Sequence, residues 1–114
     1  MTITQLLFTF EGRISRKAYW FGAVVLFAAG LAASILDWIV AGTMNGVVSM
    51  IAALVSLVAG LAISVKRWHD RDKSGWWVLI ALVPLIGLIW AFVENGFLPG
   101  TRGPNRFGPD PLDL

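Results

Sequence analysis

Three long apolar stretches restrict what this chain can fold into more than any other feature of its sequence. They cover residues 18–38, 47–65 and 76–93, and their only charged residue is Asp37, near the end of the first stretch. A helix needs about 20 apolar residues to cross the ~30 Å hydrocarbon layer of a bilayer. A helix packed on a soluble core would show a polar face, and none of the three stretches has one. The pattern predicts an all-α membrane protein with three transmembrane helices.

The size and composition of the chain agree with this fold class. Its 114 residues leave room for one domain, and 57% of them are hydrophobic against 14% charged. A chain this small cannot hide so much apolar surface from water in a soluble core. We therefore expect residues 1–114 to form a single integral membrane domain. A cleaved signal peptide is the weaker interpretation of the first stretch, which is too long for one and has 17 residues ahead of it.

Two segments lie outside the predicted spans. Residues 3–10, with the sequence ITQLLFTF, are apolar but too short to cross a bilayer. They predict a short interfacial segment that lies in the head-group layer. The tail, residues 95–114, is rich in Gly and Pro and has no apolar periodicity, which predicts irregular turns.

The distribution of Lys and Arg predicts the orientation. Three crossings put the N-terminus and the loop after the second stretch on one side, and that side carries seven basic residues: Arg13, Arg16, Lys17, Lys66, Arg67, Arg71 and Lys73. The opposite side carries Arg102 and Arg106, with Asp37 and Glu94 as water-exposed groups at its boundary. Basic loops stay in the cytoplasm. We therefore expect a cytoplasmic N-terminus and a C-terminus on the far side.

Two features within the stretches concern helix packing. Small residues recur at four-residue intervals in the second stretch, at Ala52, Ser56, Gly60 and Ser64. Helices in lipid associate through close backbone approach, which such a stripe permits. We expect the stripe to pack the second helix against the other two or against a second copy of the chain. In the third stretch, Pro84 lacks a backbone N–H and predicts a kink.

Two polar motifs at the inner boundary hold the candidate functional residues. The full set is Arg13, Arg16, Lys17, Arg67, His69, Asp70, Arg71, Ser74 and Trp76. Ser74 is expected to cap the third helix, and Trp76 to lie at the membrane interface. Three interpretations stay open for the charged members. They are a topology signal alone, a pocket for an anionic lipid or phosphate, and a salt bridge from Asp70 to Arg13 or Arg16 that locks the N-terminal segment to the loop.

His69 and Asp70 also raise the question of catalysis. A general acid–base pair needs side chains that meet, whereas adjacent residues of a helix point in different directions. His69 is the only histidine and there is no cysteine, so a zinc site lacks ligands. No phosphate-binding or dinucleotide motif occurs, and the basic residues are tied to the apolar stretches. We expect no metal, no cofactor and no nucleic-acid partner.

Four motifs in order resemble a known family. They are FEGRISRKAYW at 10–20, KRWHDRDKSGWW at 66–77, PLIG at 84–87 and GTRGPNRFGPDP at 100–111. Over residues 10–111 the chain resembles the bacterial inner-membrane family called domain of unknown function 805, with departures at Trp68 and Asp72. The resemblance implies a small multi-pass protein of the bacterial inner membrane, whose C-terminus the orientation above places in the periplasm. It brings no established activity and no catalytic residue.

The function remains a choice between hypotheses. We favour a protein, not an enzyme, that associates through its basic cytoplasmic face with anionic lipid of the phospholipid bilayer or with a partner membrane protein. One alternative is a subunit of an oligomeric channel or transporter, since three helices enclose little polar surface alone. Another is a lipid-acting enzyme that uses His69 and Asp70.

Overall fold

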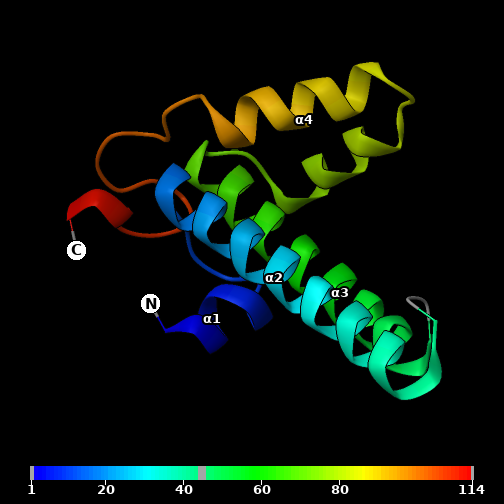
Figure 1. Cartoon of the computed structure of the whole chain (residues 1–114). Helices are drawn as coiled ribbons and strands as arrows, with labels where there is room; N and C mark the ends of the chain where they lie inside the picture. Colours follow the sequence, from blue (N-terminus) through cyan, green and yellow to red (C-terminus); the bar gives the residue numbers. More distant parts are fainter. Residues whose placement is uncertain (1, 44–45, 114) are drawn as a thin grey trace.

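The computed structural model describes residues 2–43 and 46–113 and is mostly helical (Figure 1). Two long helices, α2 (Arg16–Ala41) and α3 (Val47–Asp70), form its body. The shorter elements are α1 (Ile3–Phe8), the 3-10 helix η1 (Gly75–Leu82), α4 (Ile86–Gly96) and the 3-10 helix η2 (Pro111–Asp113). The described residues form no β-strand.

α2 and α3 lie side by side and run in opposite directions (Figure 1). At 1.5 Å per residue, their 26 and 24 residues extend about 39 and about 36 Å, which is enough to cross a bilayer. The side chain of Ser15 caps the start of α2 by accepting the backbone N–H of Ala18. The helix ends at Ala41 and is followed by Gly42, whose φ of 71° is left-handed. The first two predicted spans are therefore helices that extend beyond their apolar stretches.

Asp37 of α2 caps the N-terminus of α3. Its carboxylate oxygens accept the backbone N–H groups of Val48 and Ser49 at 3.2 and 2.7 Å. A helix N-terminus has unpaired N–H groups and a partial positive charge, so a carboxylate stabilises it. Because only 4% of Asp37 is exposed, the prediction of a water-exposed boundary group is wrong for this residue.

The third apolar stretch is not one continuous helix. It forms η1 and α4, and the chain reverses between them at residues 83–85, so that α4 runs back past η1 (Figure 1). With a rise of about 2.0 Å per residue in η1 and 1.5 Å in α4, each arm is about 16 Å long, roughly half of a hydrocarbon layer. The prediction of a third continuous span is therefore wrong, and the bend at Pro84 is a reversal instead of a kink.

Three residues explain the reversal. Pro84 has no N–H for a helical hydrogen bond and favours an extended conformation at Val83, which has ψ of 115°. Leu85 takes a positive φ of 63°, which is uncommon for a non-glycine residue. A Cβ at Gly87 would lie 1.7 Å from the carbonyl oxygen of Ile80, so this close approach requires glycine.

The reversal brings the tail to the same end of the molecule as the N-terminal segment. Arg13 donates a hydrogen bond to the carbonyl of Thr101 at 2.5 Å, and Glu94 forms an ion pair with Arg71 at 3.3 Å. Groups on opposite sides of a bilayer cannot make such contacts. The structure therefore contradicts the prediction that the tail and Glu94 lie opposite the N-terminus.

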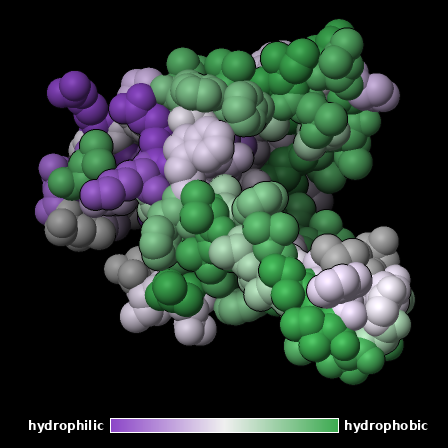
Figure 2. Space-filling view, in the orientation of Figure 1, coloured by the Kyte–Doolittle hydropathy of each residue, from purple (hydrophilic) through white to green (hydrophobic). Residues whose placement is uncertain are grey.

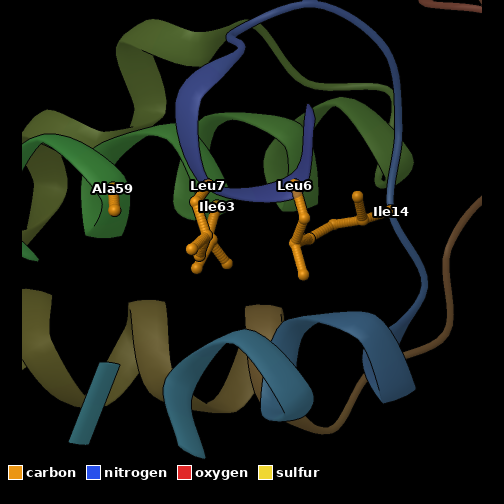
Figure 3. Packing of buried hydrophobic residues seen from close by; sticks show 5 residues of the cluster. All are labelled: Leu6, Leu7, Ile14, Ala59 and Ile63. Carbon is orange, nitrogen blue, oxygen red and sulfur yellow. The ribbon is translucent and has the colours of Figure 1, made fainter. Parts of the chain in front are cut away.

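α1 is a short helix that packs across the two long ones. Leu6 and Leu7 of α1 meet Ile14 and, on α3, Ala59 and Ile63 in a buried apolar cluster (Figure 3). Their burial holds the N-terminal segment close to the end of α3. This contact positions the following segment, so that the Arg13 side chain lies close to the end of α3.

Lys66 of α3 binds the C-terminal end of α1. Its buried Nζ donates to the carbonyl of Gln5 at 2.5 Å, to the carbonyl of Leu6, and to Oγ1 of Thr9 at 3.3 Å. The last carbonyls of a helix lack partners within that helix. A lysine ammonium has three donors, and each of them finds an acceptor here.

The closest contacts of α3 are not made by its stripe of small residues. Its members Ala52, Ser56, Gly60 and Ser64 are half-buried. The fully buried small residues of α3 are Ala59 and Ala62 instead, and a Cβ at Gly60 would meet nothing within 4 Å. Ala52 and Ser56 line a shallow groove of about 400 Å³ together with α2. The close packing predicted at Gly60 is therefore not observed.

The remaining surface of the helices is apolar. Figure 2 shows hydrophobic side chains along the helices and hydrophilic ones gathered at one end. Phe27, Val40 and Leu82 are among many large apolar side chains that are exposed. Contiguous apolar surface on this scale is rare in soluble monomers and marks contact with a membrane or a protein. Together with the length of α2 and α3, it supports an integral membrane protein.

Candidate functional site

The candidate site is the polar end of the molecule, which we call the polar cap (Figure 2). It comprises residues 12–17, 66–74 and 94–110, and it contains all nine Lys and Arg residues of the chain. The start of α2, the end of α3 and the end of α4 meet here. The cap therefore joins three segments that are far apart in the sequence.

Asp70 is the centre of the cap. One carboxylate oxygen, Oδ1, pairs with Arg13 at 3.0 Å, and the other, Oδ2, pairs with Arg67 at 2.5 Å. The exposed fractions of Arg13, Arg67 and Asp70 are only 5%, 0% and 4%. A buried charge is tolerated when it is paired and hydrogen-bonded, as all three are here. Gly100 packs directly on the carboxylate, since a Cβ there would lie 1.9 Å from Oδ2.

Arg13 joins Asp70 to the tail. Besides the carboxylate, its guanidinium donates to the carbonyls of Thr101 at 2.5 Å, Gly103 at 2.7 Å and Gly108 at 3.2 Å. A guanidinium has five N–H donors in a planar fork, and this one uses both edges. One side chain therefore sets the course of the tail over residues 101–108.

A row of consecutive backbone carbonyls, at residues 95–99, forms the second feature of the cap. α4 ends at Gly96 and leaves its last carbonyls without helical partners. Each carbonyl of the row accepts a hydrogen bond from a side chain of α2, of α3 or of the residue that follows α3. In the order of the carbonyls the donors are Arg67 Nε, Trp20 Nε1, Arg16 Nη1, Arg67 Nη2 and Arg71 Nη1. These bonds hold the returning arm of the hairpin against the two long helices.

Glu94 forms a second, more exposed ion cluster. It pairs with Lys73 and, at 3.3 Å, with Arg71, and it accepts a hydrogen bond from Nε1 of Trp90 at 2.9 Å. The ammonium of Lys73 also lies 4.7 Å from the ring centroid of Trp77, within the range of a cation–π contact. The cluster ties the end of α4 to the turn that precedes η1.

His69 is covered by the tail. Its ring stacks on Phe107 with centroids 4.0 Å apart and planes 4° apart, and its Nδ1 lies 2.9 Å from the carbonyl oxygen of Gly12. The His69 carbonyl accepts a hydrogen bond from the Asn105 side chain at 2.9 Å. His69 is thus a packing residue that fixes the tail turn. Asp70 beside it has both oxygens in ion pairs, so this arrangement offers no free carboxylate for acid–base chemistry.

The other predicted residues are less central. Ser74 accepts the backbone N–H of Trp76 at 3.3 Å and so caps η1, the first arm of the hairpin. Trp76 is 78% exposed. Lys17 is exposed and makes no ion pair within the described residues. Five residues that shape the cap were not among the candidates from the sequence: Trp20, Lys66, Glu94, Asn105 and Phe107.

A polar cavity of about 680 Å³ opens in the cap between the start of α2 and the tail. Arg16, Lys17 and Arg102 are the cationic groups of its lining, and Asp110 and Asp113 are acidic members besides the already paired carboxylate. Lys17 and Arg102 form no hydrogen bond or ion pair through their side chains in the part of the chain described. Arg16 uses one nitrogen, Nη1, on the carbonyl row. The cavity therefore presents cationic donors that the fold does not use.

Asp110, which lines this cavity, stabilises the turns of the tail. Its carboxylate accepts the backbone N–H groups of Leu112 at 3.0 Å and Gly103 at 2.9 Å. These hydrogen bonds hold the pKa of Asp110 below its ordinary value, because they favour the ionised form. Asp110 is accordingly committed to the turn as a carboxylate.

The fold and the cap define a class: a small helical membrane protein whose basic residues are folded together at one end. Residues 7–109 match the family described as protein of unknown function DUF805, and the chain belongs to this family. The family that the four sequence motifs indicated is thereby confirmed.

Curated relatives agree with this class. The chain is 40% identical over 106 residues to "Inner membrane protein YhaH" of Escherichia coli K12, which covers 90% of this chain and 86% of the relative. It is 36% identical over 103 residues to "Inner membrane protein YhaI" of the same strain, with 90% and 85% covered. To "Uncharacterized protein YiiR" it is 29% identical over 139 residues, with 100% and 93% covered. No solved structure matches the chain. These names support an inner-membrane location and state no enzymatic activity.

Proposed function

We propose that this protein crosses the inner membrane twice, with both chain ends in the cytoplasm, and that its polar cap binds anionic phospholipid head groups at the cytoplasmic surface. In this topology α2 and α3 are the spans. The arms η1 and α4 form a re-entrant hairpin that enters the bilayer from the cytoplasmic side and returns to it.

The charge distribution supports this orientation. All nine basic residues lie in the polar cap, and the loop at residues 42–46 between the spans has none. With three crossings, two of the nine would lie on the far side. The two-span arrangement therefore satisfies the positive-inside rule more completely than the topology expected from hydropathy.

The observation that carries the lipid proposal is the set of unused cations around the polar cavity. Most arginines of the cap are bound to backbone carbonyls or carboxylates, and such groups are not available to a ligand. Lys17 and Arg102 make no such bond within the described residues, and Arg16 uses only Nη1, on the Phe97 carbonyl. All three line the cavity near the start of α2. Guanidinium and ammonium groups at this level meet the phosphates of the head-group layer.

The two alternative functions receive less support. An enzyme built on His69 and Asp70 lacks a free carboxylate, because both oxygens of Asp70 are held by arginines. For a channel or transporter subunit, no observation on the described residues points to a polar path along the spans. Association with lipid is therefore the function that the geometry favours.

A matched pair of variants tests the proposal. Arg102 lines the cavity and makes no side-chain hydrogen bond or ion pair within the described residues, whereas Arg106, in the same tail, pairs with Asp72 outside the cavity. In native mass spectrometry of the protein with phosphatidylglycerol, Arg102→Ala is expected to reduce lipid retention about five-fold, since a direct hydrogen bond to the lipid phosphate contributes about 1 kcal/mol. Arg106→Ala removes the same charge and should leave retention unchanged. Equal retention by both variants and the unaltered protein would contradict the proposal.

A further inference from the structure

A second cavity adjoins the polar one. It measures about 490 Å³ and lies between α1, the first turns of α2 and η2. Its walls are largely apolar, with Ile3, Leu6 and Phe21 among them, whereas the polar cavity is lined mainly by charged and tail residues. Ser15 and Lys17 line both cavities. The molecule thus places apolar space next to cationic space at one site.

The two cavities differ in their depth along α2. The polar cavity includes Arg16, the first residue of the helix, and the apolar one reaches Ala18 and Phe21, where the apolar stretch begins. In the proposed topology, the first lies at the level of the head groups and the second at the start of the hydrocarbon layer. A soluble anion would use only the first of these.

We infer that the two cavities together bind one glycerophospholipid molecule, with its phosphate among Arg16, Lys17 and Arg102 and one acyl chain between α1 and α2. This inference rests on the proposed function and deepens it, because it names a defined site for a single lipid. Charge complementarity accounts for the head group, and apolar walls account for the chain.

The walls of the site are held in place without the lipid. α1 is anchored by its buried leucines and by Lys66, which binds the carbonyls at its C-terminal end. Lys17 lies at the junction, where its aliphatic stem can follow the apolar wall while its ammonium meets the phosphate. A site formed in advance loses less conformational entropy on binding.

A photoactivatable lipid tests the site directly. The probe is phosphatidylglycerol with a diazirine in one acyl chain, added at low molar ratio to the full-length protein in detergent, and adducts are mapped by mass spectrometry. We expect them to concentrate at residues 3–6 and 18–21. Unlabelled phosphatidylglycerol should compete, whereas inorganic phosphate and phosphatidylcholine should not. The unaltered protein gives this map, so the test does not depend on a variant that folds.

Two alanines of α2 provide a matched pair for the acyl chain. Ala18 lines the apolar cavity, whereas Ala28 is exposed and lines no cavity that the structure describes. Ala18→Trp fills the cavity and is expected to reduce adducts at residues 3–6 at least five-fold. Ala28→Trp adds the same side chain and should leave them unchanged.

The outcomes separate the two levels of the proposal. If phosphatidylglycerol is retained in preference to phosphatidylcholine but adducts spread evenly along α2 and α3, the single-lipid site is overturned and head-group binding stands. If inorganic phosphate displaces the probe, the cavity is a phosphate site and the acyl-chain part is overturned. If no preference for phosphatidylglycerol exists, the proposed function fails and this inference fails with it.

Discussion

At the scale of single residues, the polar cap depends on Asp70. Its carboxylate lies between two arginines that are themselves buried, and each arginine also holds backbone carbonyls of the tail or of α4. Loss of the carboxylate would leave two buried positive charges side by side without compensation. The cost in folding free energy exceeds the net stabilisation that the ion pairs provide, because nothing then offsets the desolvation of the two remaining charges.

The variant Asp70→Asn tests this dependence. We expect it to lower the free energy of unfolding by about 3 kcal/mol or more, the cost of breaking a buried ion pair. The control is Asp72→Asn, which weakens an exposed pair with Arg106 and should change stability by less than about 1 kcal/mol. Thermal unfolding in detergent, followed by tryptophan fluorescence, measures both. Equal midpoints for the two variants would show that the buried pairs do not hold the cap.

At the scale of elements, the hairpin of η1 and α4 is the distinctive feature. Its arms are joined by Pro84 and by Leu85 with its positive φ, and its far end is fixed by side-chain donors to carbonyls 95–99. The arms also contact each other closely, since Gly87 packs on the backbone of Ile80. Specific residues therefore fix both the turn of the hairpin and the end of α4.

Two glycines allow a matched test of helix packing. Gly87→Ala places a methyl group against the Ile80 carbonyl, and we expect it to lower the free energy of unfolding by about 1–3 kcal/mol through overpacking. Gly60→Ala meets open space on α3, so it should leave stability unchanged or raise it by up to about 1 kcal/mol, because alanine favours the helix. Thermal unfolding of both variants in detergent measures these changes in stability. A larger loss at Gly60 would mean that the small-residue stripe packs closely after all.

At the scale of the whole molecule, charge and apolar surface are separated along the spans. Both described chain ends lie toward the same end of the molecule (Figure 1), where hydrophilic side chains gather, and the apolar surface covers the helices that lead away from it (Figure 2). A bilayer favours this distribution, because burial of an unpaired charge in hydrocarbon is costly. The separation also explains why the hairpin returns: its end at residues 94–99 carries a carboxylate and a row of carbonyls that find their partners only in the cap.

Reporter fusions test the topology. A fluorescent reporter active in the cytoplasm, fused after Leu114, is expected to be fluorescent, and alkaline phosphatase at the same point is expected to be inactive. Alkaline phosphatase inserted in the loop at residues 42–46 should be active, which controls for expression. An active phosphatase after Leu114 would show that the third stretch crosses the membrane.

For the candidate site, the sequence identified the components but not their partners. Arg13, Arg67 and Asp70 were expected at the same boundary because each flanks an apolar stretch. Which arginine pairs with Asp70 depends on how α1 and α3 pack, since Arg13 and Asp70 are 57 residues apart. The carbonyl row at 95–99 could not be predicted, because every residue has a carbonyl and only the fold selects those that lack a backbone partner.

For the fold, the sequence by itself determined that the chain is helical and belongs in a membrane, because length and hydropathy are local properties of a stretch. They also located α2 and α3 to within a few residues. Only the tertiary structure decided that the third stretch turns back. Its hydropathy is the same whether it crosses or returns, and the choice is made by Pro84, by Leu85 and by distant arginines that hold the end of α4. Contacts between segments far apart in the sequence leave no periodic pattern in it, and they fix the side on which the chain ends.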